Sequence, residues 1–210
     1  MLFRSFGTLH NTYAFFALYA NIDGFTNNDP QLPVSDRTEL DRWILSELHS
    51  LIRTVDESYA DYEPTRAARA IGDFVSEHLS NWYVRLGRRR FWKGELSTDK
   101  RSAYQTLYTC LETIARLMAP IAPFYADQSF RNLNGVTGKE EVNSVHLADF
   151  PMYDPALVDK ELEERMELAQ RISVRAIAAN GAAPPPPSVS EDNSPRNSAA
   201  ASVALQGNAS

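Results

Sequence analysis

The sequence contains little cysteine and histidine, and this scarcity limits the kinds of site that it can form. Cys110 is the single cysteine in 210 residues, so no disulfide can form within the chain, which is typical of a reducing cytoplasm. The four histidines are scattered singly, at positions His10, His49, His78 and His146. No second ligand stands at metal-binding spacing. We therefore expect no metal site, a cytoplasmic location, and no functional role for Cys110 or His146.

Long apolar runs and phosphate-binding motifs are missing as well. No stretch approaches the roughly 20 apolar residues that span a membrane, and residues 1–25 lack the basic segment and compact apolar block of a signal peptide. There is no glycine-rich phosphate loop and no nucleophile elbow. The sequence therefore predicts a soluble globular domain without catalytic residues of its own.

The positive charge is concentrated in one segment of a chain whose net charge is −6. Asn81–Trp92 holds four arginines and four aromatic residues in twelve positions, and no acidic residue lies between Arg85 and Lys93. Guanidinium groups and aromatic rings both stack on unpaired bases, and guanidinium groups also bind phosphates. The segment therefore predicts contact with single-stranded or loop RNA. The alternative interpretation is that the aromatic residues belong to the core and the arginines form a solvated helix end.

Apolar residues recur at helical spacing nearly throughout, which predicts an all-α bundle of about five main helices. The first apolar stripe runs from Leu2 to Ala20 and stops before Gly24. A capping box of Asp36 and Glu39 is expected to open the second helix. The remaining predicted helices start at Pro64, at Ser97 or Thr98, and at Asp159, and the last of them continues to about Ala178.

Three features mark the expected breaks and core of this bundle. Pro120 and Pro123 cannot continue a straight helix, so the chain should kink and restart near Phe124. Asn134-Gly135 is expected to end that helix, and Val142–Pro151 is expected to form a short extended crossing. The aromatic residues expected in the core are Trp43, Tyr104 and Tyr108.

The composition changes near the C-terminus. Pro184–Pro187 are four consecutive prolines, and no aromatic residue follows Asn180. Such a segment buries too little apolar surface to offset the entropy of ordering it. We therefore predict a helical domain at residues 1–178 and a Pro/Ser/Ala/Asn-rich tail at 179–210, which is disordered or foreign to the domain.

The third predicted helix leaves two possibilities for its arginines. An α-helical wheel, with about 100° per residue, places Arg88 off the apolar face and Arg89 near the centre of that face. A charged side chain there is costly unless it is paired. Either the helix ends at Gly87, or an ion pair holds Arg89. The first possibility is simpler, and it predicts that Arg88–Trp92 form a loop or turn.

Five sequence blocks resemble the helical anticodon-binding domain of class I aminoacyl-tRNA synthetases of the isoleucine, valine, leucine and methionine group, and the similarity is greatest to the isoleucyl-tRNA synthetase family. The resemblance covers about residues 2–175. The blocks are Asn11-Thr12-Tyr13 with Tyr19-Ala20-Asn21-Ile22-Asp23-Gly24-Phe25, Leu40-Asp41-Arg42-Trp43-Ile44-Leu45-Ser46, Asn81–Trp92, Leu117-Met118-Ala119-Pro120-Ile121-Ala122-Pro123-Phe124 and Ser144-Val145-His146-Leu147.

The resemblance implies a helical bundle that binds the anticodon stem-loop of isoleucine tRNA as part of a ligase. The family's His-Ile-Gly-His-like and Lys-Met-Ser-Lys-Ser-like elements are missing from the chain, so we expect that it cannot activate an amino acid by itself. ATP and magnesium are expected only for the full enzyme. The expected partners are isoleucine tRNA and the catalytic and editing domains of a parent chain, and a monomer is expected. The candidate tRNA-binding residues are Asn11, Arg85, Arg88, Arg89, Arg90 and Trp92.

Each candidate also has a structural interpretation. Arg85 and Arg90 fit the pattern of arginines that pair and pack at helix ends. Trp92 is equally consistent with a buried side chain that closes the bundle, and Asn11 with an exposed helix residue. For the whole chain, the alternatives are the same domain of a valyl-, leucyl- or methionyl-tRNA synthetase, or a helical protein-interaction module.

Overall fold

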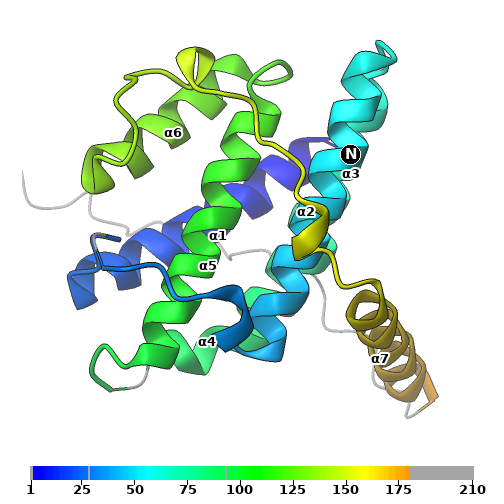
Figure 1. Cartoon of the computed structure of the whole chain (residues 1–210). Coiled ribbons are helices and arrows are strands. Elements are labelled where there is room, and N and C mark those ends of the chain that lie inside the picture. The colour runs from blue at the N-terminus through cyan, green and yellow to red at the C-terminus, as the bar shows by residue number, and fades with distance from the viewer. Residues whose placement is uncertain (1, 28, 93, 180–210) are drawn as a thin grey trace, which may run out of the picture. The chain divides into compact units, whose positions relative to one another are not determined.

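A computed structural model describes residues 2–27, 29–92 and 94–179, and the predicted disorder of the tail falls outside these residues (Figure 1). The described residues contain helices and no strand, which confirms the all-α prediction. Segment η2 is a π-helix, and η1, η3 and η4 are short 3-10 helices. The elements are α1 (Leu2–Asp23), η1 (Val34–Asp36), α2 (Glu39–Ala60), α3 (Pro64–Asp73), η2 (Phe74–Val84), α4 (Arg85–Trp92), α5 (Thr98–Met118), α6 (Pro123–Thr137), η3 (Val145–Leu147), η4 (Pro155–Leu157) and α7 (Lys160–Ala179).

The chain divides into two compact units within α7. The first unit ends at Met166 and the second begins at Glu167. Everything described below lies in the first unit. The division between a domain at 1–178 and a tail at 179–210 stays a prediction, because most of that tail lies outside the described residues.

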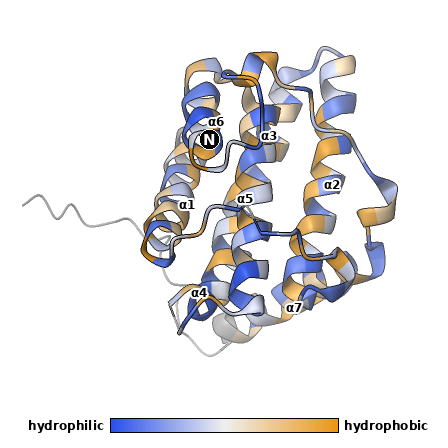
Figure 2. Cartoon of the chain, turned by 60° about the vertical axis from the view of Figure 1, so that its left-hand side comes forward, coloured by the Kyte–Doolittle hydropathy of each residue, from blue (hydrophilic) through white to orange (hydrophobic). Residues whose placement is uncertain are grey.

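Helix α5 forms the centre of the first unit, with α1, α2 and α6 around it (Figure 1). Apolar and polar residues alternate along the helices, as Figure 2 shows, because each helix buries an apolar stripe against its neighbours. Tyr104 of α5 stacks on Phe25 with 4.9 Å between the ring centroids, and Phe91 meets it edge-on at 5.1 Å. The predicted core positions of Trp43, Tyr104 and Tyr108 are confirmed, since all three side chains are buried.

Several predicted helix starts are confirmed by the local chemistry. Pro64 stands in the first turn of α3, and Pro123 begins α6 after the break at Pro120. Ser97 caps α5, because its hydroxyl accepts a hydrogen bond from the backbone N–H of Lys100 at 3.2 Å. The fifth predicted helix is α7, which begins at Lys160.

The capping box predicted at Asp36 is wrong. Asp36 belongs to η1, and Thr38 caps α2 by accepting from the backbone N–H of Asp41 at 3.3 Å. The cause is the intervening Arg37, whose buried guanidinium donates from Nε to the carbonyl of Leu32 and from Nη1 to Thr106. Those bonds hold residue 37 in an extended conformation, so the helix begins only after it.

The predicted stop at Asn134-Gly135 is also wrong. Helix α6 continues to Thr137 and ends at Gly138, whose φ of 57° is left-handed. The side chain of Asn134 stays in the helix and binds the loop that follows, accepting from the N–H of Glu140 at 2.8 Å and donating to its carbonyl at 2.9 Å. The crossing expected at Val142–Pro151 contains the short helix η3, which Asp127 anchors through the backbone N–H of Val145.

Candidate nucleic-acid interface

The arginine-rich segment is helical in the structure, contrary to the loop or turn expected after Gly87. Helix α4 continues through Gly87 to Trp92. Among the described residues, the glycines with positive φ are Gly24, Gly94 and Gly138. Gly87 is buried inside the helix, and the left-handed residue that follows this helix is Gly94. A glycine favours a helix end where its position is not packed, and Gly87 is packed inside α4.

The π-helix η2 explains why the helical wheel assigned the arginines incorrectly. A π-helix forms i→i+5 hydrogen bonds and turns less per residue than an α-helix. A wheel drawn at a constant α-helical angle therefore falls out of phase across Phe74–Val84. The wheel placed Arg89 on the buried side, whereas the structure leaves Arg89 exposed and turns Arg90 toward the bundle. The ion pair that was one of the two possibilities is formed by Arg90 instead, one position later in the chain.

Four of the predicted site residues lie on one exposed face of α4, which we call the arginine face: Arg85, Arg88, Arg89 and Trp92. They occupy positions i, i+3, i+4 and i+7, which share one side of an α-helix. All four are exposed, and Gly87 and Phe91 face the bundle instead. The side chain of Trp92 is 54% exposed, so it does not close the bundle. Within the described part of the chain, none of these three arginines forms an ion pair.

Arg88 lies between two aromatic rings of different helices. Its Cζ is 5.9 Å from the ring centroid of Trp92 and 5.9 Å from that of Phe15 on α1. Both distances are within the range of cation–π attraction. Sequence analysis missed Phe15 as a site residue, because it stands beside Phe16 and off the apolar stripe of α1. The signal was the second aromatic residue of the Phe15-Phe16 pair, which is only partly buried and packs edge-on against Phe91 at 5.2 Å.

Asn11 lies on the same side of α1 as Phe15, one helical turn earlier in the chain. Its side chain is exposed. Phe15 contacts Arg88, so Asn11 flanks the arginine face. The structure thus brings Asn11 near the predicted arginines and leaves its amide accessible to a ligand.

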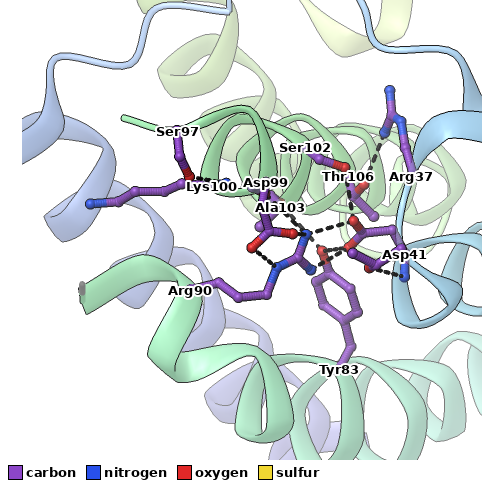
Figure 3. Close-up of polar contacts among 11 residues, drawn as sticks. Arg37, Asp41, Tyr83, Arg90, Ser97, Asp99, Lys100, Ser102, Ala103 and Thr106 are labelled. Atoms are coloured by element: carbon purple, nitrogen blue, oxygen red, sulfur yellow. Dashed lines mark hydrogen bonds and ion pairs between the residues drawn. The ribbon is translucent and has the colours of Figure 1, made fainter. Parts of the chain in front are cut away.

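Arg90 points toward Asp41, Asp99 and Tyr83 (Figure 3). Its Nη1 and Nη2 donate to the two carboxylate oxygens of Asp41, each at 2.7 Å. Its Nε donates to the side chain of Asp99 at 3.0 Å, and Nη2 also donates to the Asp99 carbonyl. Four of the five N–H groups of the guanidinium are therefore occupied. This is the structural pairing that the sequence left open for Arg90.

The carboxylate of Asp41 is the centre of this buried cluster. It is fully buried, and it also accepts from the hydroxyls of Tyr83 at 2.7 Å and Ser102 at 2.8 Å. Burial acts to raise the pKa of Asp41, but the hydrogen bonds and charge of Arg90, with the two hydroxyls, outweigh it and lower that pKa. The pKa of Tyr83 is raised by burial and by the charge of Asp41. The cluster thus joins α2, η2, α4 and α5 and fixes the orientation of α4.

Two further absences hold for the described residues. They contain no group of three or more His, Cys, Asp or Glu side chains that could hold a metal ion. None of their helices has both the length and the apolar character needed to cross a bilayer. Cys110 is buried and free.

Comparison with known proteins decides the family. Residues 41–182 match the family model described as the anticodon-binding domain of tRNA ligase. The chain belongs to this family. The match covers the Asp41–Arg90 cluster and the whole arginine face, so both features are parts of an anticodon-binding domain.

Curated relatives of this anticodon-binding domain are isoleucine–tRNA ligases. The chain is 65% identical over 170 residues to the enzyme of Cytophaga hutchinsonii, an alignment that covers 81% of this chain and 15% of that protein. It is 61% identical over 175 residues to the enzyme of Bacteroides fragilis, covering 83% and 15%. For the enzyme of Dehalococcoides mccartyi the identity is 49% over 175 residues, covering 83% and 17%. The chain therefore spans about one sixth of the length of these relatives.

Proposed function

We propose that this anticodon-binding domain binds the anticodon stem-loop of isoleucine tRNA through the arginine face of α4. The observation that carries the proposal is the grouping of three exposed arginines, which form no ion pair with a described residue, and an exposed tryptophan on one side of a helix. The relatives at 61–65% identity are named isoleucine–tRNA ligases, which favours isoleucine over valine, leucine or methionine. The family match favours RNA binding over a helical protein-interaction module.

The chemistry of the arginine face suits an RNA loop. Unpaired bases stack on aromatic rings and on guanidinium planes, and arginines also bind the phosphate backbone. Arg88 and Trp92 present a flat cationic surface already in contact, so little side-chain entropy is lost when a base stacks on it. Arg85 and Arg89 flank that surface, and their exposed guanidinium groups can bind phosphates. Asn11 offers an amide that can bind a base edge.

Arg90 has a supporting role in this proposal. Its guanidinium is occupied by Asp41 and Asp99, so it orients α4 instead of binding RNA. Arg90 was among the predicted tRNA-binding residues, and we now assign it to positioning.

The larger context of the proposal is a complete isoleucine–tRNA ligase in the cytoplasm. Binding of the anticodon would position the acceptor end for aminoacylation by catalytic and editing domains, which would use ATP and magnesium. We propose that the ligase acts as a monomer. The 210-residue chain alone is then expected to show no isoleucine-dependent ATP–pyrophosphate exchange above a heat-inactivated control.

The test is a binding titration with the 210-residue chain. The isoleucine anticodon stem-loop is compared with a stem-loop of the same length and charge whose loop sequence is scrambled, at two salt concentrations. We expect tighter binding of the native loop at both salts, with affinity falling as salt rises, because phosphate contacts release counterions. Equal binding of the two RNAs would contradict the proposal.

A further inference from the structure

A cleft opens on the side of α1 that faces away from the arginine face. It lies between the later turns of α1 and α6, and its cavity volume is about 80 Å³. A single bound water needs only about 10–15 Å³ on the same measure, so the cleft has room for a larger group. Its floor consists of the aromatic side chains of Phe16, Phe25 and Tyr108, all of them buried in the core.

The rim of the cleft carries amides and a hydroxyl. Asn21 of α1 and Asn132 of α6 stand on opposite walls, and Tyr13 lies beside them. Asn132 uses its Oδ1 to accept from Gln128 at 2.8 Å, which leaves its Nδ2 available. Among the described residues, no side-chain hydrogen bond is formed by Asn21 or by the hydroxyl of Tyr13. The rim therefore offers unused donors and acceptors on both sides of an aromatic floor.

The lining selects for a flat, neutral group with polar edges. No charged residue lines the cleft, so nothing there would neutralise a phosphate or a carboxylate. A purely apolar side chain would fill the floor but would form no hydrogen bond with Asn21 or Asn132, whose amides are exposed at the rim. A nucleobase has an aromatic face for the floor and hydrogen-bonding edges for the amides.

The position of the cleft relates it to the arginine face through α1. Phe15 on one flank of α1 touches Arg88, and Ala17 on the other flank lines the cleft. Residues 5–22 of α1, which include Phe15 and Ala17, contain no charged residue. A phosphate backbone that crosses α1 would therefore meet no acidic side chain on that helix before the cleft.

We propose that the cleft between α1 and α6 receives one unpaired base of an RNA loop whose neighbouring nucleotides lie on the arginine face. This inference rests on the proposed function, since it assigns a second contact to the same RNA. The base stacks against the aromatic floor, and Asn21 and Asn132 bind its edges.

The experiment combines protein variants with single abasic nucleotides in the loop of the stem-loop RNA. Ala17→Phe fills the cleft, and Ala60→Phe makes the same change at an exposed position of α2 outside the lining. For the wild-type chain and for Ala60→Phe, removal of one particular loop base should weaken binding about tenfold, the size expected for a lost base–aromatic stack. For Ala17→Phe, removal of that same base should have no effect, because the cleft is already occupied.

Asn21→Ala provides a second variant in case Ala17→Phe lowers the thermal midpoint of the domain. Asn21 is exposed, so this change should leave the thermal midpoint unaltered while it reduces the penalty of the same abasic nucleotide. The inference is overturned if each abasic nucleotide weakens binding equally in wild type, Ala17→Phe and Asn21→Ala while Arg88→Ala still weakens binding. That outcome leaves the proposed function intact. If the wild-type chain does not distinguish the native loop from the scrambled loop, the proposed function and the cleft both fail.

Discussion

Arg88 and Arg90 are two residues apart on α4 and have opposite surroundings. Arg88 lies exposed between Phe15 and Trp92 and forms no ion pair with a described residue. Arg90 points into the bundle and donates four hydrogen bonds to Asp41 and Asp99. The same residue type therefore has two different environments within one helical turn. The pairing of Arg90 with Asp41 ties α4 to α2, whereas its neighbours Arg88 and Arg89 are exposed.

The comparison makes the buried cluster the most sensitive point of the fold. Arg90→Ala leaves the buried carboxylate of Asp41 without its cation, and breaking such a pair costs about 3–5 kcal/mol. For a domain of this size, the thermal midpoint should fall by roughly 6–20 °C. Thermal unfolding followed by circular dichroism measures this. Arg89→Ala is the matched control, one residue away and exposed, and its thermal midpoint should equal that of the wild type. A similar drop in the thermal midpoint of both variants would show that Arg90 is no more important to the fold than Arg89.

The opposite expectation holds for the arginine face. Arg88→Ala and Arg89→Ala should each weaken binding of the isoleucine anticodon stem-loop by about 1–3 kcal/mol, with the thermal midpoint unchanged. Where the lost contact is to a phosphate, the slope of log affinity against log salt should also become shallower by about 0.7–0.9. Filter binding at several salt concentrations tests both statements.

Two controls sharpen this test of the arginine face. Arg66→Ala removes an exposed arginine of α3 that forms no ion pair among the described residues, and it should bind RNA like the wild type. Arg88→Lys keeps the charge but loses the planar group that stacks, so it should recover the salt dependence without the full affinity. Normal binding by Arg88→Ala and Arg89→Ala at all salts would assign these arginines to a solvated helix surface, and Asn11 would be the next residue to test.

Trp92 gives a smaller effect, because its ring contributes stacking without charge. Trp92→Ala should weaken RNA binding by about 1 kcal/mol, at the lower end of the range for base–aromatic stacks, and should leave the salt slope unchanged. Trp82, half-buried in η2, is the matched control: Trp82→Ala should lower the thermal midpoint before it affects binding. If Trp92→Ala instead destabilises the fold as strongly as Trp82→Ala, its ring is a packing residue.

The smallest expected effect is that of the C-terminal segment. Removal of residues 180–210 should change the thermal midpoint by no more than about one or two degrees, because the segment has no aromatic residue and four consecutive prolines. Differential scanning calorimetry of the full and shortened chains provides the measurement. A fall of about ten degrees would indicate that the segment packs on the domain.

The sequence predicted most of the fold, because helix positions depend on local patterns. The starts of α3, α5 and α6 followed from Pro64, Ser97 and Pro123, and the burial of Trp43 and Tyr104 followed from apolar periodicity. The family blocks and the arginine-rich segment also pointed to the correct family. Helix ends were less predictable where a distant contact overrode the local signal, as at Arg37 and Asn134.

The candidate site was predicted in composition but not in arrangement. The sequence alone determined that arginines and aromatic residues would stand together between Asn81 and Trp92. Only the tertiary structure decided that Arg90, and not Arg89, turns inward. The physical reason is twofold: the π-helix η2 changes the angle between successive residues, and the partner of Arg90 is an aspartate 49 positions earlier in the chain. A local sequence pattern shows neither the change in helical angle across η2 nor that Asp41 lies next to Arg90 in the fold.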